Sequence, residues 1–298
     1  MSVNKKDLGA LPRVILPLLI LGGIAYAVFN PSIFKSWQVP SVIKDMGISG
    51  STLPKGMLSW SELEKQKRYT DLDEALKNPM EVKILDLSGQ NLKKFPVDIA
   101  LLTNLQILDL QNNRLEEIPN NIQTLNKLQY LYLRKNQLTK LTPRIGNLTF
   151  LKHLDLSGNQ LAVLFQEIGN ITELQELDIT DNKIIRLPDE LAKLKHLKIL
   201  RTGNNSLSEL PKIVAQLDSL ETFDISRNTS LEIRPSLILI GKMKSLRRLE
   251  MRSMGIVHVP NAIGSLKNIR NLNFQGNKLT ANEQKEFKKT LPDVDVDF

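Results

Sequence analysis

The chain has 298 residues, with 40 Lys and Arg against 32 Asp and Glu, and so a formal net charge of +8 at pH 7. It contains no cysteine, which excludes disulfides, thiolate metal sites and cysteine nucleophiles. The basic residues are scattered and no nucleic-acid-binding motif accompanies them, so we expect no nucleic-acid partner.

The first thirty residues are predicted to be a targeting segment. Residues 14–29 form an uncharged, mostly apolar run with three basic residues before it. One interpretation is a signal peptide cleaved near Ala27, which would give a secreted or periplasmic protein. The other is an uncleaved anchor that extends back to Leu8 to cross a ~30 Å hydrocarbon core. We favour the anchor, and the basic start then predicts a single-pass membrane protein whose remainder is exported.

Two further segments precede the main body of the chain. Residues 31–59 are predicted to be a linker, because they contain several prolines and no hydrophobic period persists. Over residues 60–81 apolar residues return at helical spacing, and Asn78-Pro79 ends the pattern. This segment directly precedes a repeated array whose first unit has nothing stacked on its outer side. We therefore interpret it as a helical N-terminal cap.

Residues 82–280 repeat one phrase nine times, Leu-x-x-Leu-x-Leu-x-x-Asn-x-Leu. The copies begin every 23 residues, with one interval of 26, at Val82, Leu105, Leu128, Leu151, Leu174, Leu197, Leu220, Leu246 and Ile269. Alternation around Leu-x-Leu predicts a short strand, and the apolar spacing of the return path predicts a 3-10 or short helical turn. A single unit is too small to bury its own leucines. The units must therefore stack, with their strands in one parallel sheet.

The asparagine of the phrase is predicted to be structural. The chain leaves the strand there and turns inward, and an amide offers both a donor and an acceptor to the backbone groups left in the core. Seven units keep it, as Asn113, Asn136, Asn159, Asn182, Asn205, Asn228 and Asn277. Gln90 replaces it in the first unit. Met254 replaces it in the eighth, where we predict a loosened turn because Met cannot donate.

The 26-residue unit and the end of the chain depart from the phrase. In the long unit we interpret residues 237–240 as the buried face of an extra helical turn; an exposed sticky patch is the alternative. Residues 281–298 are predicted to be a C-terminal cap. It starts with a polar helix and ends in a strand, because Val294, Val296 and Phe298 alternate with aspartates.

The repeated phrase resembles the leucine-rich-repeat superfamily. Its Leu-Pro-x-x-Ile-x-x-Leu return path is similar to the 23-residue class of Ras-suppressor and Scribble-type proteins and many bacterial homologues. The lead-in at 69–79 and the close at Leu291-Pro292 resemble the caps of bacterial members. The resemblance implies an α/β solenoid, a horseshoe with a parallel sheet on the concave face and short 3-10 or helical turns on the convex face. It also implies a protein- or peptide-binding role and no reaction.

Side chains at the x positions of each strand are predicted to line the concave face. Between the two strand leucines an acidic ladder is interrupted at Tyr132 and Arg201. Aromatic and Arg side chains are the usual binding anchors. We therefore predict partner contacts from Tyr130, Tyr132, Arg134 and His153, and from Arg201, Arg227, Arg248 and Arg252. The alternative is that these charges neutralise one another across strands.

No pattern in the sequence predicts an enzyme. The three histidines fall at different places of different repeats and cannot converge on a metal. Phosphate loops, nucleophile elbows and paired-carboxylate clefts are absent from the sequence. We expect no cofactor and no metal, and a non-catalytic, membrane-tethered scaffold that binds a protein or peptide on its concave face. Two alternatives stay open: a secreted or envelope structural protein that binds carbohydrate, and a targeting subunit of a separate enzyme.

Overall fold

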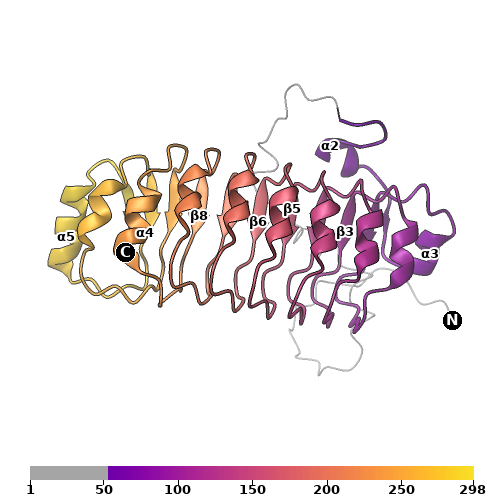
Figure 1. Ribbon diagram of the computed structural model, residues 1–298, viewed down its shortest axis with the longest axis horizontal. Helices are drawn as coiled ribbons and strands as arrows, with labels where there is room; N and C mark the ends of the chain where they lie inside the picture. The colour runs from indigo at the N-terminus through magenta and orange to yellow at the C-terminus, as the bar shows by residue number, and fades with distance from the viewer. Residues whose placement is uncertain (1–52) are drawn as a thin grey trace, which may run out of the picture. The chain divides into compact units, whose positions relative to one another are not determined.

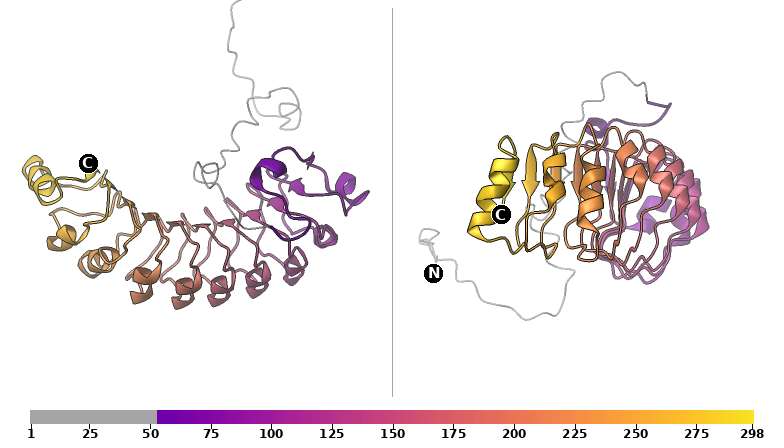
Figure 2. Two further views of the ribbon diagram at one scale, coloured as in Figure 1. Left: turned by 90° about the horizontal axis from the view of Figure 1, so that it is seen from above. Right: turned by 60° about the vertical axis from the view of Figure 1, so that its left-hand side comes forward.

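A computed structural model describes residues 53–298 of the chain. They form an eleven-stranded parallel sheet whose strands follow sequence order from β1 to β11 (Figure 1). The strands lie on the inner, concave side of a curved array, and the helices of the return paths lie on its outer, convex side (Figure 2). The sheet does not close into a barrel, so the predicted α/β solenoid is confirmed.

Every strand is short. The strands are β1 (Arg68–Tyr69), β2 (Ile84–Asp86), β3 (Ile107–Asp109), β4 (Tyr130–Tyr132), β5 (His153–Asp155), β6 (Glu176–Asp178), β7 (Ile199–Arg201), β8 (Thr222–Asp224), β9 (Arg248–Glu250), β10 (Asn271–Asn273) and β11 (Asp295–Asp297). The 3-10 helices are η2 (Val97–Leu101), η3 (Asn120–Thr124), η4 (Pro143–Asn147), η5 (Gln166–Asn170), η6 (Asp189–Lys193), η7 (Lys212–Gln216) and η8 (Asn261–Ser265). The α-helices are α2 (Trp60–Leu63), α3 (Leu72–Leu76), α4 (Ile233–Ile240) and α5 (Ala281–Thr290).

The core lies between the sheet and the convex helices. The middle residue of each three-residue strand points into it, and Leu108, Leu131 and Leu154 are aligned on neighbouring strands and fully buried. Burying one leucine side chain stabilises the fold by about 1.5–3 kcal/mol. The apolar cluster runs without interruption from Tyr69 to Leu291, so each unit completes the core of its neighbours.

The ladder asparagines connect each unit to the one before it. Asn159 Nδ2 donates to the carbonyl of Leu156 in its own unit (2.8 Å) and of Leu133 in the preceding unit (3.0 Å). Its Oδ1 accepts from the N–H of Leu138 at 3.1 Å. The same three bonds recur at Asn113, Asn136, Asn182, Asn205 and Asn228.

Met254 leaves the eighth unit without a ladder amide, and the ninth unit compensates. Asn277 Oδ1 accepts from the N–H of Met254 at 3.0 Å as well as from the N–H of Ile256 at 3.2 Å. The Met254 side chain is itself buried. The turn that we predicted to be loosened is therefore held from the neighbouring unit.

The residue before each ladder position has a left-handed backbone. These residues are Gly89, Asn112, Lys135, Gly158, Asp181, Asn204, Arg227, Ser253 and Gly276, with φ between 52° and 73°. For Lys135 and Arg227 this conformation costs roughly 1–2 kcal/mol. The stacked array therefore imposes the turn, whatever the local residue prefers.

Two glycines allow the convex turns to approach closely. A Cβ at Gly146 would lie 2.6 Å from the carbonyl oxygen of Glu167 in the next unit. A Cβ at Gly169 would lie 2.5 Å from that of Glu190. A side chain at either position would push η4, η5 and η6 apart.

The 26-residue unit replaces its 3-10 turn with the α-helix α4. Leu237 and Ile240 are buried, as predicted for the face of an extra helical turn. Ile238, between them, is 45% exposed. Only part of this apolar run therefore belongs to the core.

The array ends in α5 and β11. Thr280 caps α5 by accepting from the N–H of Glu283, whose carboxylate in turn accepts from the N–H of Thr280. β11 pairs with β10. The rings of Phe274, Phe287 and Phe298 contact one another at centroid distances of 5.3–6.5 Å and cover the open end of the core.

The predicted single-pass membrane localisation is wrong. Across residues 53–298 the structure has no helix with the length and apolarity needed to cross a bilayer. The ten residues of α5 span about 15 Å, half of a ~30 Å hydrocarbon core. Residues 14–29, from which we predicted the anchor or signal peptide, lie outside the described residues.

We expect Asn159→Ala to lower the free energy of unfolding by about 2–3 kcal/mol, because the Leu138 N–H loses its acceptor in the core. Equilibrium denaturation in urea measures the change. Asn170→Ala is the matched control, since Asn170 belongs to the same repeat and is exposed; it should cost less than about 0.5 kcal/mol. Equal losses at the two positions would contradict the structural role of the ladder.

Candidate functional site

The strand registry arranges the concave side chains in two rows. The first row begins with Ile84 and Ile107 and continues through Tyr130, His153, Glu176, Ile199, Thr222, Arg248 and Asn271. The second row is the acidic ladder with its interruptions at Tyr132 and Arg201. Residues 23 positions apart in the sequence are therefore direct neighbours on this face.

The acidic ladder has a local structural role that the sequence analysis missed. Asp155 Oδ1 accepts from the N–H of Ser157 at 2.9 Å and so closes the turn after β5. Asp86, Asp109, Asp178, Asp224 and Asn273 make the same bond two residues ahead. Short Asp and Asn side chains favour this turn. The long side chains of Tyr132 and Arg201 do not suit it, so these two positions need another explanation.

A buried charged cluster lies across β5, β6 and β7. Glu176 is 1% exposed and His153 is 3% exposed. The carboxylate of Glu176 pairs with the Arg201 guanidinium on one side, and its Oε2 lies 3.2 Å from His153 Nδ1 on the other. The Tyr132 ring contacts the His153 ring at a centroid distance of 4.9 Å. Glu176 Oε2 and both ring nitrogens of His153 are buried without a well-aligned hydrogen bond.

The charges of the cluster stabilise one another. Burial raises the pKa of Glu176, but the contacts with His153 and Arg201 outweigh it and bring that pKa down to about 2. Burial lowers the pKa of Arg201, but the carboxylates of Glu176 and Asp178 outweigh that and raise it. The cluster therefore holds an ionised carboxylate and a guanidinium against the concave surface.

The later arginines are largely neutralised by the ladder. Arg248 Nε lies 2.9 Å from Glu250, and Arg252 lies 3.4 Å from Glu250 and 3.8 Å from Asp224. Arg252 reaches Asp224 of the neighbouring unit, as in the alternative where charges cancel across strands, whereas Arg248 pairs within its own strand β9.

The structure brings only some of the predicted contact residues together. Tyr132, His153 and Arg201 meet around Glu176, a residue that the sequence analysis did not select. Arg134 is exposed beyond the end of β4, and Arg227 occupies a left-handed turn position beyond β8. Tyr130 already contacts the chain's own Trp60, at a centroid distance of 4.8 Å and an interplanar angle of 70°.

Residues 53–60, which we call the strap, lie over β3 and β4. They include the end of the segment that we predicted to be a linker. Gln106 Nε2 donates to the Gly56 carbonyl (2.9 Å), and Gln106 Oε1 accepts from the Leu58 N–H (2.8 Å). Gln129 Nε2 donates to the Leu58 carbonyl at 2.9 Å. Two side-chain amides thus hold three main-chain groups of the strap.

Apolar residues of the first concave row are buried on the strands near the strap. Ile84, Ile107 and Tyr130 are 3%, 1% and 3% exposed, although strand alternation places them on the opposite side of the sheet from the core. Met57 of the strap is buried as well, without belonging to the core cluster. In Figure 2 the indigo N-terminal segment with α2 lies on the concave side.

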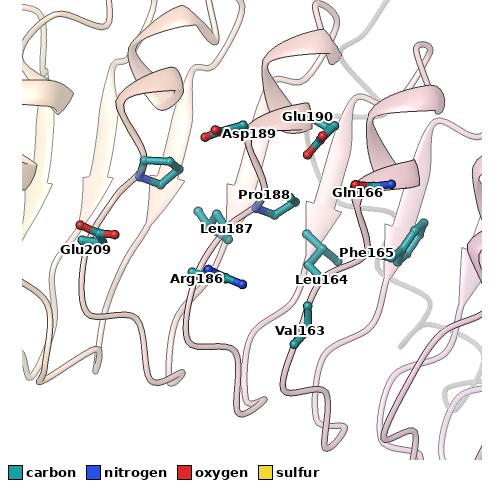
Figure 3. Close-up of a pocket in the computed structure, with 11 residues that line it drawn as sticks. Val163, Leu164, Phe165, Gln166, Arg186, Leu187, Pro188, Asp189, Glu190 and Glu209 are labelled. Carbon is teal, nitrogen blue, oxygen red and sulfur yellow. The ribbon is translucent and has the colours of Figure 1, made fainter.

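A second concavity lies on the outer side of the array, over the segments that lead into η5, η6 and η7 (Figure 3). It encloses about 500 Å³. Val163, Leu187 and Pro188 supply apolar surface, and Arg186 and Glu190 supply charge. The sequence analysis did not select it, because return-path residues at these positions have no periodic signal beyond that of the core.

A family model described as leucine-rich repeat region matches residues 60–182 and 163–294. The chain belongs to the leucine-rich-repeat family. The resemblance stated from the repeated phrase is thereby confirmed. A comparison with curated protein sequences found no match to this chain.

Solved structures of other leucine-rich-repeat proteins are similar to this chain. A TDR receptor is 22% identical, with 77% of this chain and 45% of the receptor covered and a TM-score of 0.55. The PEPR1–AtPEP1 structure is also 22% identical, with 68% and 29% covered and a TM-score of 0.55. A Leptospira interrogans leucine-rich-repeat protein is 23% identical, with 78% and 100% covered and a TM-score of 0.32. At these identities the likeness concerns the fold alone.

We expect Glu176 to make stability depend on pH. Its folded pKa of about 2 lies below the ordinary 4.5. Its contribution, about 3 kcal/mol, is therefore present above pH 4.5 and is lost as the pH falls towards 2. Glu176→Gln should be less stable than the wild type at pH 6, and the two should converge near pH 2 in denaturation measurements.

The matched control for this measurement is Glu173→Gln, an exposed carboxylate three residues before Glu176 in the sequence. It should follow the wild-type pH dependence. A Glu176→Gln protein that loses as much stability as the wild type between pH 6 and pH 2.5 would contradict the assignment.

Proposed function

We propose that the chain is a non-catalytic scaffold that binds an extended peptide segment of a partner protein on its concave face. The observation that carries this proposal is the strap. Gln106 and Gln129 already hold the main chain of residues 56–58, which follows a turn closed by the Met57 N–H and the Pro54 carbonyl, against this face. The surface therefore has the chemistry that peptide recognition needs, which is amide groups for the backbone and apolar or aromatic contacts for side chains.

The cluster around Glu176 supports a second point of contact on the same face. Tyr132 and Arg201 interrupt a ladder in which Asp and Asn side chains close the turns that follow the strands. Both are residue types that anchor binding interfaces. Arg201 keeps about a third of its side chain exposed while it pairs with Glu176. A partner that approaches here meets an aromatic ring and a guanidinium whose position is fixed by a buried carboxylate.

A peptide library displayed on phage and selected on the full-length protein tests the proposal. We expect the selected peptides to bind Tyr132→Ala and Arg134→Ala variants at least tenfold more weakly than the wild type. Arg134 is exposed next to Tyr132, so its replacement removes charge without disturbing the core. Thermal unfolding of each variant checks that the fold is intact.

Arg186→Ala is the matched control, because Arg186 lines the concavity on the outer side of the array. Selected peptides should bind this variant as they bind the wild type. Peptides that lose affinity only for Arg186→Ala would indicate that the binding site lies on the outer side of the array. Peptides insensitive to all three changes would remove the concave-face proposal.

A further inference from the structure

We propose that the strap is a self-ligand: it fills a peptide site on the concave face over β3 and β4, and a partner peptide that stays extended displaces it. This inference rests on the proposed function and specifies the occupied site, the partner's backbone conformation and the regulation of binding.

The contacts of the strap are those of a bound peptide. Gln106 forms hydrogen bonds with the carbonyl of Gly56 and the N–H of Leu58. An extended strand presents these two main-chain groups to a neighbouring strand. Gln129 Nε2 donates to the carbonyl of Leu58 and also to Gln106 Oε1, at 2.9 Å in the second bond. These bonds do not depend on the side chains of the strap. Any polypeptide of the same conformation can make them.

The strap leaves this site incompletely filled. Gln129 Oε1 is buried and has no hydrogen-bond partner. Gln106 accepts from the N–H that lies two residues after the carbonyl to which it donates. Gln129 donates to the carbonyl of Leu58, so the equivalent donor for Gln129 Oε1 is the N–H of Trp60. Trp60 instead begins α2, with helical backbone. A peptide that remains extended at this position supplies the missing donor, and filling a buried acceptor that lacks a partner favours binding.

Exchange of the strap has to release these main-chain hydrogen bonds and the contact of Trp60 with Tyr130. Gly56 has φ of +85°, a conformation in which only glycine is unstrained. The described contacts of residues 53–60 with the concave face come from a few side chains, Gln106, Gln129 and Tyr130 among them. Trp60 packs edge-on against Tyr130, so a partner needs an aromatic or other large apolar residue at this place.

The test uses two synthetic peptides and the full-length chain. The first peptide has the sequence of residues 53–66. The second carries Ser61→Pro, because the residue before a proline is driven out of the helical region, which keeps Trp60 extended. Fluorescence anisotropy measures their binding to the wild type, to Trp60→Ala and Gly56→Ala proteins in which the strap is loosened, and to Lys55→Ala as the matched control.

We expect the first peptide to bind Trp60→Ala and Gly56→Ala at least tenfold more tightly than the wild type and Lys55→Ala. Adding Gln106→Ala and Gln129→Ala to either loosened variant should abolish binding. The Ser61→Pro peptide should bind each loosened variant more tightly than the first peptide does. Hydrogen exchange of the Leu58 amide should be slow in the wild type and fast in the loosened variants.

Equal binding to wild-type and loosened proteins would overturn the proposal, as would binding that survives removal of both glutamines. Failure of both peptides to bind any variant, with the Leu58 amide protected throughout, would show that the strap is a fixed part of the fold and would equally overturn it. These outcomes are separate from the proposed function. Phage-selected peptides that need Tyr132 and Arg134 but ignore the strap would leave concave-face binding intact and remove only the self-ligand.

Discussion

The structure depends on an amide hydrogen bond that connects one repeat to the next. Each ladder asparagine donates to a carbonyl of its own unit and to one of the unit before, and accepts from an N–H of that earlier unit. The turn interior is closed to water, so a unit without its neighbour would bury these groups unpaired. This requirement fixes the strand order and aligns equivalent residues. The alignment is what makes Gln106 a neighbour of Gln129 and Glu176 a neighbour of Arg201.

Periodicity in the sequence predicted most of what the ladder controls. The strands, the 3-10 turns, the buried leucines and the concave rows all recur at the interval of the repeated phrase. The left-handed turns at Lys135 and Arg227 did not follow from local preference, because residues with long side chains avoid that conformation in isolation. The packing of the stacked units offsets the conformational cost of these turns. The sequence of a single unit therefore does not predict them.

The candidate site was predictable only in part, because its decisive contacts are not periodic. The strap reaches Gln106 and Gln129 across 48 to 71 positions of sequence, and it is held through its main chain, so no residue pattern marks it. The acidic ladder looked like a charged surface, whereas Asp155 and its equivalents close turns. Glu176 falls at a position where the other units carry Ile, Tyr, His, Thr, Arg or Asn, and its role appears only when Arg201 is placed beside it.

The spacing of the outer turns determines the curvature of the concave face. Strand spacing is fixed near ~4.8 Å by the sheet, so the distance between successive outer turns sets the radius of the arc. Gly146 and Gly169 let those turns close in, which flattens the arc around β5 to β7. A rigid ligand matches only one radius. Gly146 and Gly169, on the outer side, thereby determine where along the concave face such a ligand fits.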